Sequence, residues 1–129
     1  MIFIDASFFI ASVLKNDEWH GRVRKIFPKI KEEDKMTSIL MLSEAVTLTG
    51  SLGGGKNGVK LYSYIVDNHE VVYVDKDTSF SALETFLKYD GVLSFADSVS
   101  VELMKRFKVD SIVSFDSDFD KVDGIYRIH

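Results

Sequence analysis

Four acidic residues lie at the edges of apolar segments, where a carboxylate is costly to bury. Asp5 is the only charge in the opening segment MIFIDASFFIASVL, and Glu44 is the only charge in MTSILMLSEAVTLTGSLGGG. Asp97 follows the run GVLSFA, and Asp116 follows the run SIVSF. An isolated carboxylate beside a core must be paired, hydrogen-bonded or bound to a cation. Four such positions predict one shared purpose, which is to bind a divalent metal ion.

Composition narrows the class of protein. A chain of 129 residues with 46% hydrophobic residues predicts one domain, spanning residues 1–129, with a sizeable core. The absence of cysteine excludes disulfides and thiolate zinc sites. Asp5 interrupts an N-terminus that lacks a basic segment, which argues against a signal peptide, and no apolar run has the length of a membrane helix. We therefore expect a cytoplasmic protein with no membrane partner.

Short apolar runs alternate with helical patterns along the chain, which predicts an α/β fold. Strands are expected at residues 1–5, 36–38, 70–74, 111–115 and 124–129, and helices after Ser7, where Ser7 could be the cap, and at 18–30, 38–49, 56–68, 79–89 and 95–107. Strands separated by helices form a mostly parallel sheet that helices flank on both faces, a three-layer Rossmann-like arrangement. Binding sites in such folds lie beyond the carboxyl ends of the strands, where Asp5 and Asp116 are expected.

Each acid also has a structural interpretation that the sequence leaves open. Asp5 could cap the helix that follows it, and the motif Ser-Phe-Ala-Asp ending at Asp97 matches a capping box. Asp116 could be a turn residue, an interpretation that is the better one for Asp118. Glu44 could be a lone, partly exposed acid on an apolar helix.

The ligand chemistry selects the metal. Sites built from carboxylate oxygens suit hard cations such as Mg²⁺ or Mn²⁺. The histidines lie far apart in the sequence, which argues against zinc or haem. Metal ions held by acids are a common device for phosphodiester hydrolysis. The net charge of −4 gives no global attraction for nucleic acid, so any such contact must use local basic patches.

Two other motifs fail on inspection. GSLGGGKN has the glycines and lysine of a phosphate-binding loop, but Asn57 replaces the required Ser or Thr and a helix precedes it. This segment is better interpreted as a flexible helix end and loop. DSDFDKVDGIYR begins like a calcium loop, but Lys121 and Arg127 occupy the positions of its glycine and its final glutamate.

Taken in order, four segments resemble those of the PIN-domain nucleases, and most closely the small VapC-type toxins. These segments are MIFIDASFFIA, LSEAVTL, LSFADSVSVELMKRF and IVSFDSDFDKVDGI. None is specific alone, but their order and spacing together are. The resemblance places the catalytic, metal-binding acids on Asp5, Glu44, Asp97 and Asp116, an auxiliary acid on Asp118, and hydroxyl residues that order the site on Ser7 and Ser114.

The resemblance implies a metal-dependent endoribonuclease that cleaves single-stranded RNA and leaves a 5′-phosphate and a 3′-hydroxyl. Asp5, Asp97 and Asp116 would bind Mg²⁺ or Mn²⁺, and Glu44 would bind a second ion or position the attacking water. It also implies a homodimer that forms through the early helices, and a cognate antitoxin that could neutralise the acids with an arginine. Candidates for RNA backbone contacts, each of which could instead be ordinary solvated surface, are Arg22, Arg24, Lys25, Lys56, Lys60, Lys105 and Arg106.

Two alternatives stay open on the sequence. One is an RNA-processing PIN nuclease that has no antitoxin. The other is a non-catalytic binding or signalling module of doubly wound fold, such as a degenerate receiver domain. Loss of one or more acids would favour the module, and all four are present.

Overall fold

A five-stranded parallel sheet forms the centre of the computed structural model, which describes residues 1–129. The strand order is β3-β2-β1-β4-β5, and every neighbouring pair is parallel. The predicted parallel sheet is therefore confirmed. The strands are β1 (Ile2–Ile4), β2 (Lys35–Ser38), β3 (Glu70–Val72), β4 (Ser111–Val113) and β5 (Tyr126–Ile128).

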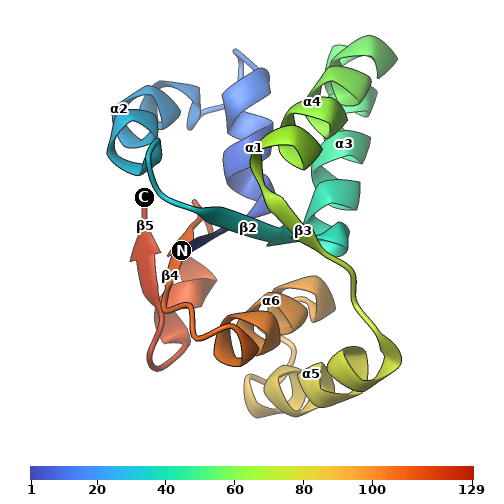
Figure 1. The fold of residues 1–129 in the computed structure, drawn as a ribbon, viewed down its shortest axis with the longest axis vertical. Helices are drawn as coiled ribbons and strands as arrows, with labels where there is room; N and C mark the ends of the chain where they lie inside the picture. Colours follow the sequence, from blue (N-terminus) through green and yellow to red (C-terminus); the bar gives the residue numbers. More distant parts are fainter.

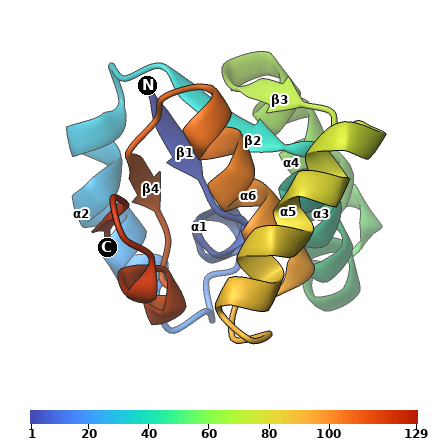
Figure 2. The ribbon, with the colours of Figure 1, turned by 90° about the horizontal axis from the view of Figure 1, so that it is seen from below.

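Helices cover both faces of this sheet, as the sequence predicts. Figure 1 shows α1 to α4 above the sheet and α5 and α6 below it, with α6 between the sheet and α5. Figure 2, seen from below, shows α5 and α6 crossing in front of the strands. The helices are α1 (Ala6–Val13), α2 (His20–Ile30), α3 (Ile39–Gly53), α4 (Gly55–Asn68), α5 (Lys76–Lys88) and α6 (Phe95–Arg106), and a short 3₁₀ helix, η1, spans Ser117–Lys121.

The order of the strands places a switch point at the middle of the sheet. From β1 the chain moves outward through β2 and β3, and it then returns to add β4 and β5 on the other side. β4 pairs directly with β1, with Phe3 opposite Ile112 and Ile4 opposite Val113. In open α/β sheets the crevice beyond the strand ends at such a point is where ligands bind.

The glycine-rich segment at residues 50–55 is not the flexible loop that the sequence suggests. Helix α3 continues through it to Gly53, and Gly54, at φ 92°, makes a tight turn into α4. A Cβ atom on Gly58 would lie 3.2 Å from the Val46 carbonyl oxygen and 3.3 Å from the Gly50 Cα atom. The glycines therefore allow two helices to pack closely, a need that sequence periodicity does not reveal.

Several other boundaries differ from the predicted ones. Helix α2 begins at His20 rather than at residue 18, β3 ends at Val72 rather than at residue 74, and β5 spans Tyr126–Ile128 rather than residues 124–129. Helix α5 begins at Lys76 rather than at residue 79, because the Asp75 side chain caps it by accepting a hydrogen bond from the Thr78 amide at 2.8 Å. Strand β4 ends at Val113, so Ser114 and Phe115 lie beyond the sheet edge. No helix of the structure combines the length and the apolar character needed to cross a bilayer.

Two buried threonines provide a matched test of the packing. Thr49 on α3 is fully buried and its hydroxyl has no hydrogen-bond partner, whereas the Thr37 hydroxyl donates to the Ile4 carbonyl oxygen at 2.8 Å. We expect Thr49→Val to raise the free energy of unfolding by about 1 kcal/mol, because it removes an unpaired polar group. Thr37→Val should lower it by about 1 kcal/mol, because it removes a buried hydrogen bond. Urea denaturation measures both, and equal effects of the two variants would contradict this assignment.

Candidate active site

Asp5 lies at the carboxyl end of the central strand and is almost completely buried, at 5% exposure. Its Oδ2 atom accepts hydrogen bonds from the Ser7 hydroxyl at 2.6 Å, the Ser114 hydroxyl at 2.8 Å and the Ser7 amide at 3.3 Å. All three donors share one oxygen, which leaves Oδ1 for another partner. Burial raises the pKa of Asp5 above its ordinary value, and the serine hydrogen bonds oppose that rise.

The cap of helix α1 is Asp5 and not Ser7, which corrects the predicted start of this helix. A carboxylate at this point accepts from the first free amides of the helix and faces the positive end of its dipole. Ser7 instead directs its hydroxyl back to Asp5. The structural interpretation of Asp5 as a cap is thus correct, and it is compatible with a role in binding a cation.

Asp116 follows β4 and lies beside Asp5 because β4 pairs with β1. Two serines connect the strand ends. The Ser114 hydroxyl accepts from the Asp116 amide at 3.0 Å while it donates to Asp5, and the Ser7 hydroxyl accepts from the Phe115 amide at 3.0 Å. Hydrogen bonds thereby fix the two acids relative to each other at the switch point.

Asp97 and Glu44 reach the same region from opposite faces of the sheet. Asp97 lies in the first turn of α6, and its amide donates to the Ser94 hydroxyl at 3.0 Å, as the capping-box motif predicts. Burial and the charges of Asp5 and Asp116 raise the pKa of Asp97 to about 7. Glu44 lies on α3 with an exposed side chain, and partial desolvation followed by the charges of Asp5 and Asp116 raises its pKa. The charges of Asp5 and Asp116 thus act on both Asp97 and Glu44, which indicates that all four carboxylates lie near the same end of the sheet.

We name Asp5, Glu44, Asp97 and Asp116 the acid cluster. No lysine or arginine compensates it, because the three ion pairs of the structure join other residues: Arg106 with Glu102, Lys121 with Asp118, and Arg127 with Asp120.

A divalent cation fits this site chemically. Oxygen ligands that repel one another and lack a counter-charge are the donor set that a hard cation prefers. No three of the Asp, Glu or His side chains are grouped as ready ligands of one ion. Carboxylates that repel one another stay apart without a cation, so we expect ion binding to draw them together.

Asp118, the predicted auxiliary acid, is only loosely connected to this site. Its amide donates to Oδ1 of Asp116 at 2.9 Å, which makes it part of the turn after β4. Its carboxylate is paired with Lys121 at 2.9 Å. The backbone of Asp118 therefore belongs to the turn after β4, in agreement with its interpretation as a turn residue.

The predicted RNA-binding cations do not gather at one place. Arg22, Arg24 and Lys25 lie on α2, and Lys56 and Lys60 lie on α4. Lys105 and Arg106 end α6, roughly 13 Å along the helix axis from Asp97 at a rise of 1.5 Å per residue. The Arg106 guanidinium also binds Glu102 and the hydroxyls of Thr78 and Ser81, so it joins α6 to α5.

Arg127 is an important residue of the site region that the sequence reasoning missed. It donates two hydrogen bonds to the Asp120 carboxylate, at 2.8 Å and 2.9 Å, and one to the Ser114 carbonyl oxygen at 3.2 Å. Its side chain is only 9% exposed. This bidentate contact fastens β5 and η1 to the residue that supports Asp5. The sequence feature that could have identified Arg127 is its position as a charged residue within the apolar final strand.

A doubly wound parallel sheet with a carboxylate site at its switch point defines the class of this protein. The family model of the PIN domain matches residues 2–125, and the chain therefore belongs to the PIN-domain family. The predicted resemblance is confirmed.

Individual relatives support this membership. The chain is 29% identical over 121 residues to the 23S rRNA-specific endonuclease VapC20 of Mycobacterium tuberculosis. This match covers 92% of each protein. The crystal structure of VapC20, described as a sarcin-ricin loop cleaving toxin, superposes with a TM-score of 0.85 at 27% identity over 94% of each chain. FitAcB from Neisseria gonorrhoeae shares the fold, with a TM-score of 0.73 at 14% identity over 100% of this chain and 97% of that one.

The raised pKa of Asp97 makes stability depend on pH. The unfolded chain loses this proton near pH 3.8, and the folded protein keeps it to about pH 7. The folded state thus binds more protons between these values, and the stability of the metal-free protein should fall as pH rises from about 4 to 7. Asp97→Asn removes this loss, so at pH 8 in EDTA we expect it to be more stable than the wild type by about 1 kcal/mol.

Urea denaturation at a series of pH values from 4 to 8 measures the effect. The control is Asp123→Asn, at an exposed residue before β5 and at the opposite edge of the sheet. A constant difference between Asp97→Asn and wild type across this range would contradict the burial and repulsion assigned to Asp97.

Proposed function

We propose that residues 1–129 form a single PIN domain that acts as a divalent-metal-dependent endoribonuclease, the toxin of a toxin–antitoxin pair. The observation that carries the proposal is the acid cluster. Asp5 and Asp116 follow two paired strands at the switch point of a parallel sheet, their charges act on Asp97 and Glu44, and no cationic side chain pairs with any of the four. Asp5 is buried, and Asp97 and Asp116 are partly buried, without a counter-charge; this is unfavourable and indicates that a function maintains them.

Each acid has a role in this proposal. Asp5, Asp97 and Asp116 would hold Mg²⁺ or Mn²⁺, and the bound ion would supply positive charge for the phosphate and lower the pKa of a water molecule. Ser7 and Ser114 orient Asp5 by donating to a single oxygen. The exposed Glu44 has room to position the attacking water and to accept its proton.

RNA as the substrate and a toxin role rest on the relatives. A protein named as a 23S rRNA-specific endonuclease matches nearly the whole chain, and its structure is described as a toxin that cleaves the sarcin-ricin loop. The exposed cations on α2 and α4 supply contacts for RNA phosphates. We further propose a cognate antitoxin, whose arginine would neutralise the acid cluster, and a homodimer.

Cleavage of RNA tests the enzymatic part of the proposal. The purified protein is incubated with single-stranded RNA and with a ribosomal-RNA hairpin, in Mn²⁺, Mg²⁺ or EDTA. We expect metal-dependent cleavage that Asp116→Asn lowers by at least 10²-fold, because the variant removes one ligand charge but keeps the acceptor for the Asp118 amide. Asp123→Asn, at the opposite sheet edge, is the matched control and should cleave like the wild type. Full activity of Asp116→Asn, or of the wild type in EDTA, would reject the assignment.

The toxin role has a separate readout. Induced expression of the chain in a bacterium should arrest growth, and Asp116→Asn should not. Co-expression of the neighbouring gene for a small DNA-binding protein should restore growth. An active nuclease whose expression leaves growth unchanged would instead be an RNA-processing PIN nuclease.

A further inference from the structure

Three aromatic rings form a continuous stack that runs from the core to solvent beside the acid cluster. The Phe8 and Phe115 ring centroids lie 6.1 Å apart, at an interplanar angle of 28°. The Phe115 and Trp19 centroids lie 5.1 Å apart, and these rings are nearly parallel at 5°. Phe8 is buried at 5% exposure, whereas Trp19 is 42% exposed. The stack therefore ends in the largest aromatic side chain of the chain, held against the protein and open to water.

The position of this stack relative to the acids is fixed. Phe115 immediately precedes Asp116, and its amide donates to the Ser7 hydroxyl that also binds Asp5. Trp19 is held by its own hydrogen bonds, since its amide donates to Oδ1 of Asp17 at 2.8 Å. The next residue, His20, contacts the Ala11 carbonyl oxygen on α1 through Nδ1 at 2.6 Å. Trp19 is thus preorganised near the site rather than placed on a loose loop.

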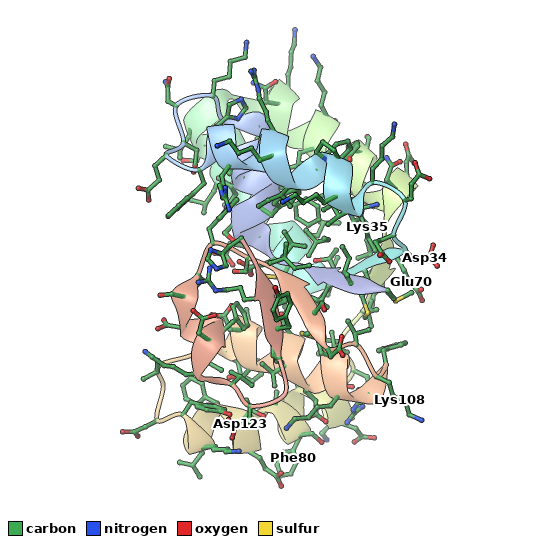
Figure 3. All side chains as sticks on the ribbon, turned by 90° about the vertical axis from the view of Figure 1, so that its left-hand side faces the viewer. Asp34, Lys35, Glu70, Phe80, Lys108 and Asp123 are labelled. Carbon is green, nitrogen blue, oxygen red and sulfur yellow. The ribbon has the colours of Figure 1, made fainter.

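The charge around Trp19 suits a polyanion. Helix α2 begins one residue after Trp19 and carries Arg22, Arg24 and Lys25 on exposed positions. None of these cations is paired with an acidic side chain, although the Arg22 guanidinium donates a hydrogen bond to the His129 backbone oxygen at 2.9 Å. In Figure 3, Phe80 marks the outer side of α5, at the end of the molecule opposite α2. The exposed Trp19 ring lies beside these cations at the start of α2, and its contact with Phe115 links it to Asp116, the next residue in the chain.

We propose that Trp19 is a stacking platform for one RNA base next to the scissile phosphate, an inference that rests on the proposed ribonuclease function. A base would add the next layer to the Phe8–Phe115–Trp19 stack, while α2 contacts the neighbouring phosphates. Stacking does not depend on base-edge hydrogen bonds, so it sets the position of the strand more than its sequence. Trp19 is accordingly a positioning residue, and the acids perform the chemistry.

The chain offers a direct probe, because Trp19 is its only tryptophan. Metal-free protein in EDTA is titrated with a short single-stranded RNA and with the ribosomal-RNA hairpin, and tryptophan fluorescence is recorded beside the anisotropy of labelled RNA. We expect quenching that saturates together with the anisotropy. Replacing single bases by abasic sites should abolish the quenching at one position and leave it at the others.

Kinetics separate positioning from a merely structural role. We expect Trp19→Ala to raise KM about 5- to 100-fold with little change in kcat, and Trp19→Phe to restore most of the loss, because Phe keeps a stacking face. Phe80→Ala is the matched control, since Phe80 is a 75% exposed aromatic residue on α5 far from α2. Thermal melting confirms that each variant is folded.

The outcomes distinguish the two proposals. RNA binding and metal-dependent cleavage without quenching, or with an unchanged KM in Trp19→Ala, overturn the stacking role and leave the ribonuclease intact. The stacking role is also overturned if Trp19→Ala lowers only kcat and Trp19→Phe restores that kcat. Loss of packing against Phe115 would explain such a result. If the wild type neither binds nor cleaves either RNA, both proposals fail together.

Discussion

The structure depends on how a buried carboxylate, Asp5, is kept at the end of the central strand. Only 5% of Asp5 is exposed to water, and no cationic side chain pairs with it. Ser7 and Ser114 take over part of that solvation, and they belong to segments that the fold must bring together: the first turn of α1 and the end of β4. The Arg127 contact then fixes the Ser114 backbone. The hydrogen bonds that stabilise the Asp5 carboxylate thus also fix the geometry at the centre of the sheet.

The same grouping of acids lowers the stability of the metal-free protein, and its proposed function is to bind a cation. Without a bound ion, Asp97 and Glu44 add their charges to a site that already holds Asp5 and Asp116, and burial and repulsion raise their pKa values. A fold selected for stability alone would place an amide or an apolar residue at one of these positions. A divalent cation reverses the sign of this contribution, because it turns repelling oxygens into shared ligands.

Local patterns in the sequence were sufficient for much of the fold. The parallel sheet, the position of Asp5 and Asp116 after strand ends and the capping box at Asp97 follow from runs of apolar residues and from short motifs. What the sequence could not provide were contacts between distant segments and the exact boundaries of elements. The Gly50–Gly58 approach, the Arg127–Asp120 pair and the stacking of Trp19 on Phe115 join residues whose spacing has no helical or strand period. Asp5 as the cap of α1 was recognisable, but Ser7 competed for the same role.

The pairing of β1 with β4 has a consequence for how the protein is made. The hydrogen bond between Ser114 and Asp5 spans 109 residues, so the central strand gains its second neighbour long after it has been synthesised. Contacts this distant in sequence form late and slow the folding of a domain. During translation, Asp5 and Glu44 emerge long before Asp97 and Asp116 exist to complete the cluster. A chain that has been made only as far as α6 therefore lacks Asp116 and the Ser114 hydrogen bond to Asp5, so its acid cluster is not yet assembled.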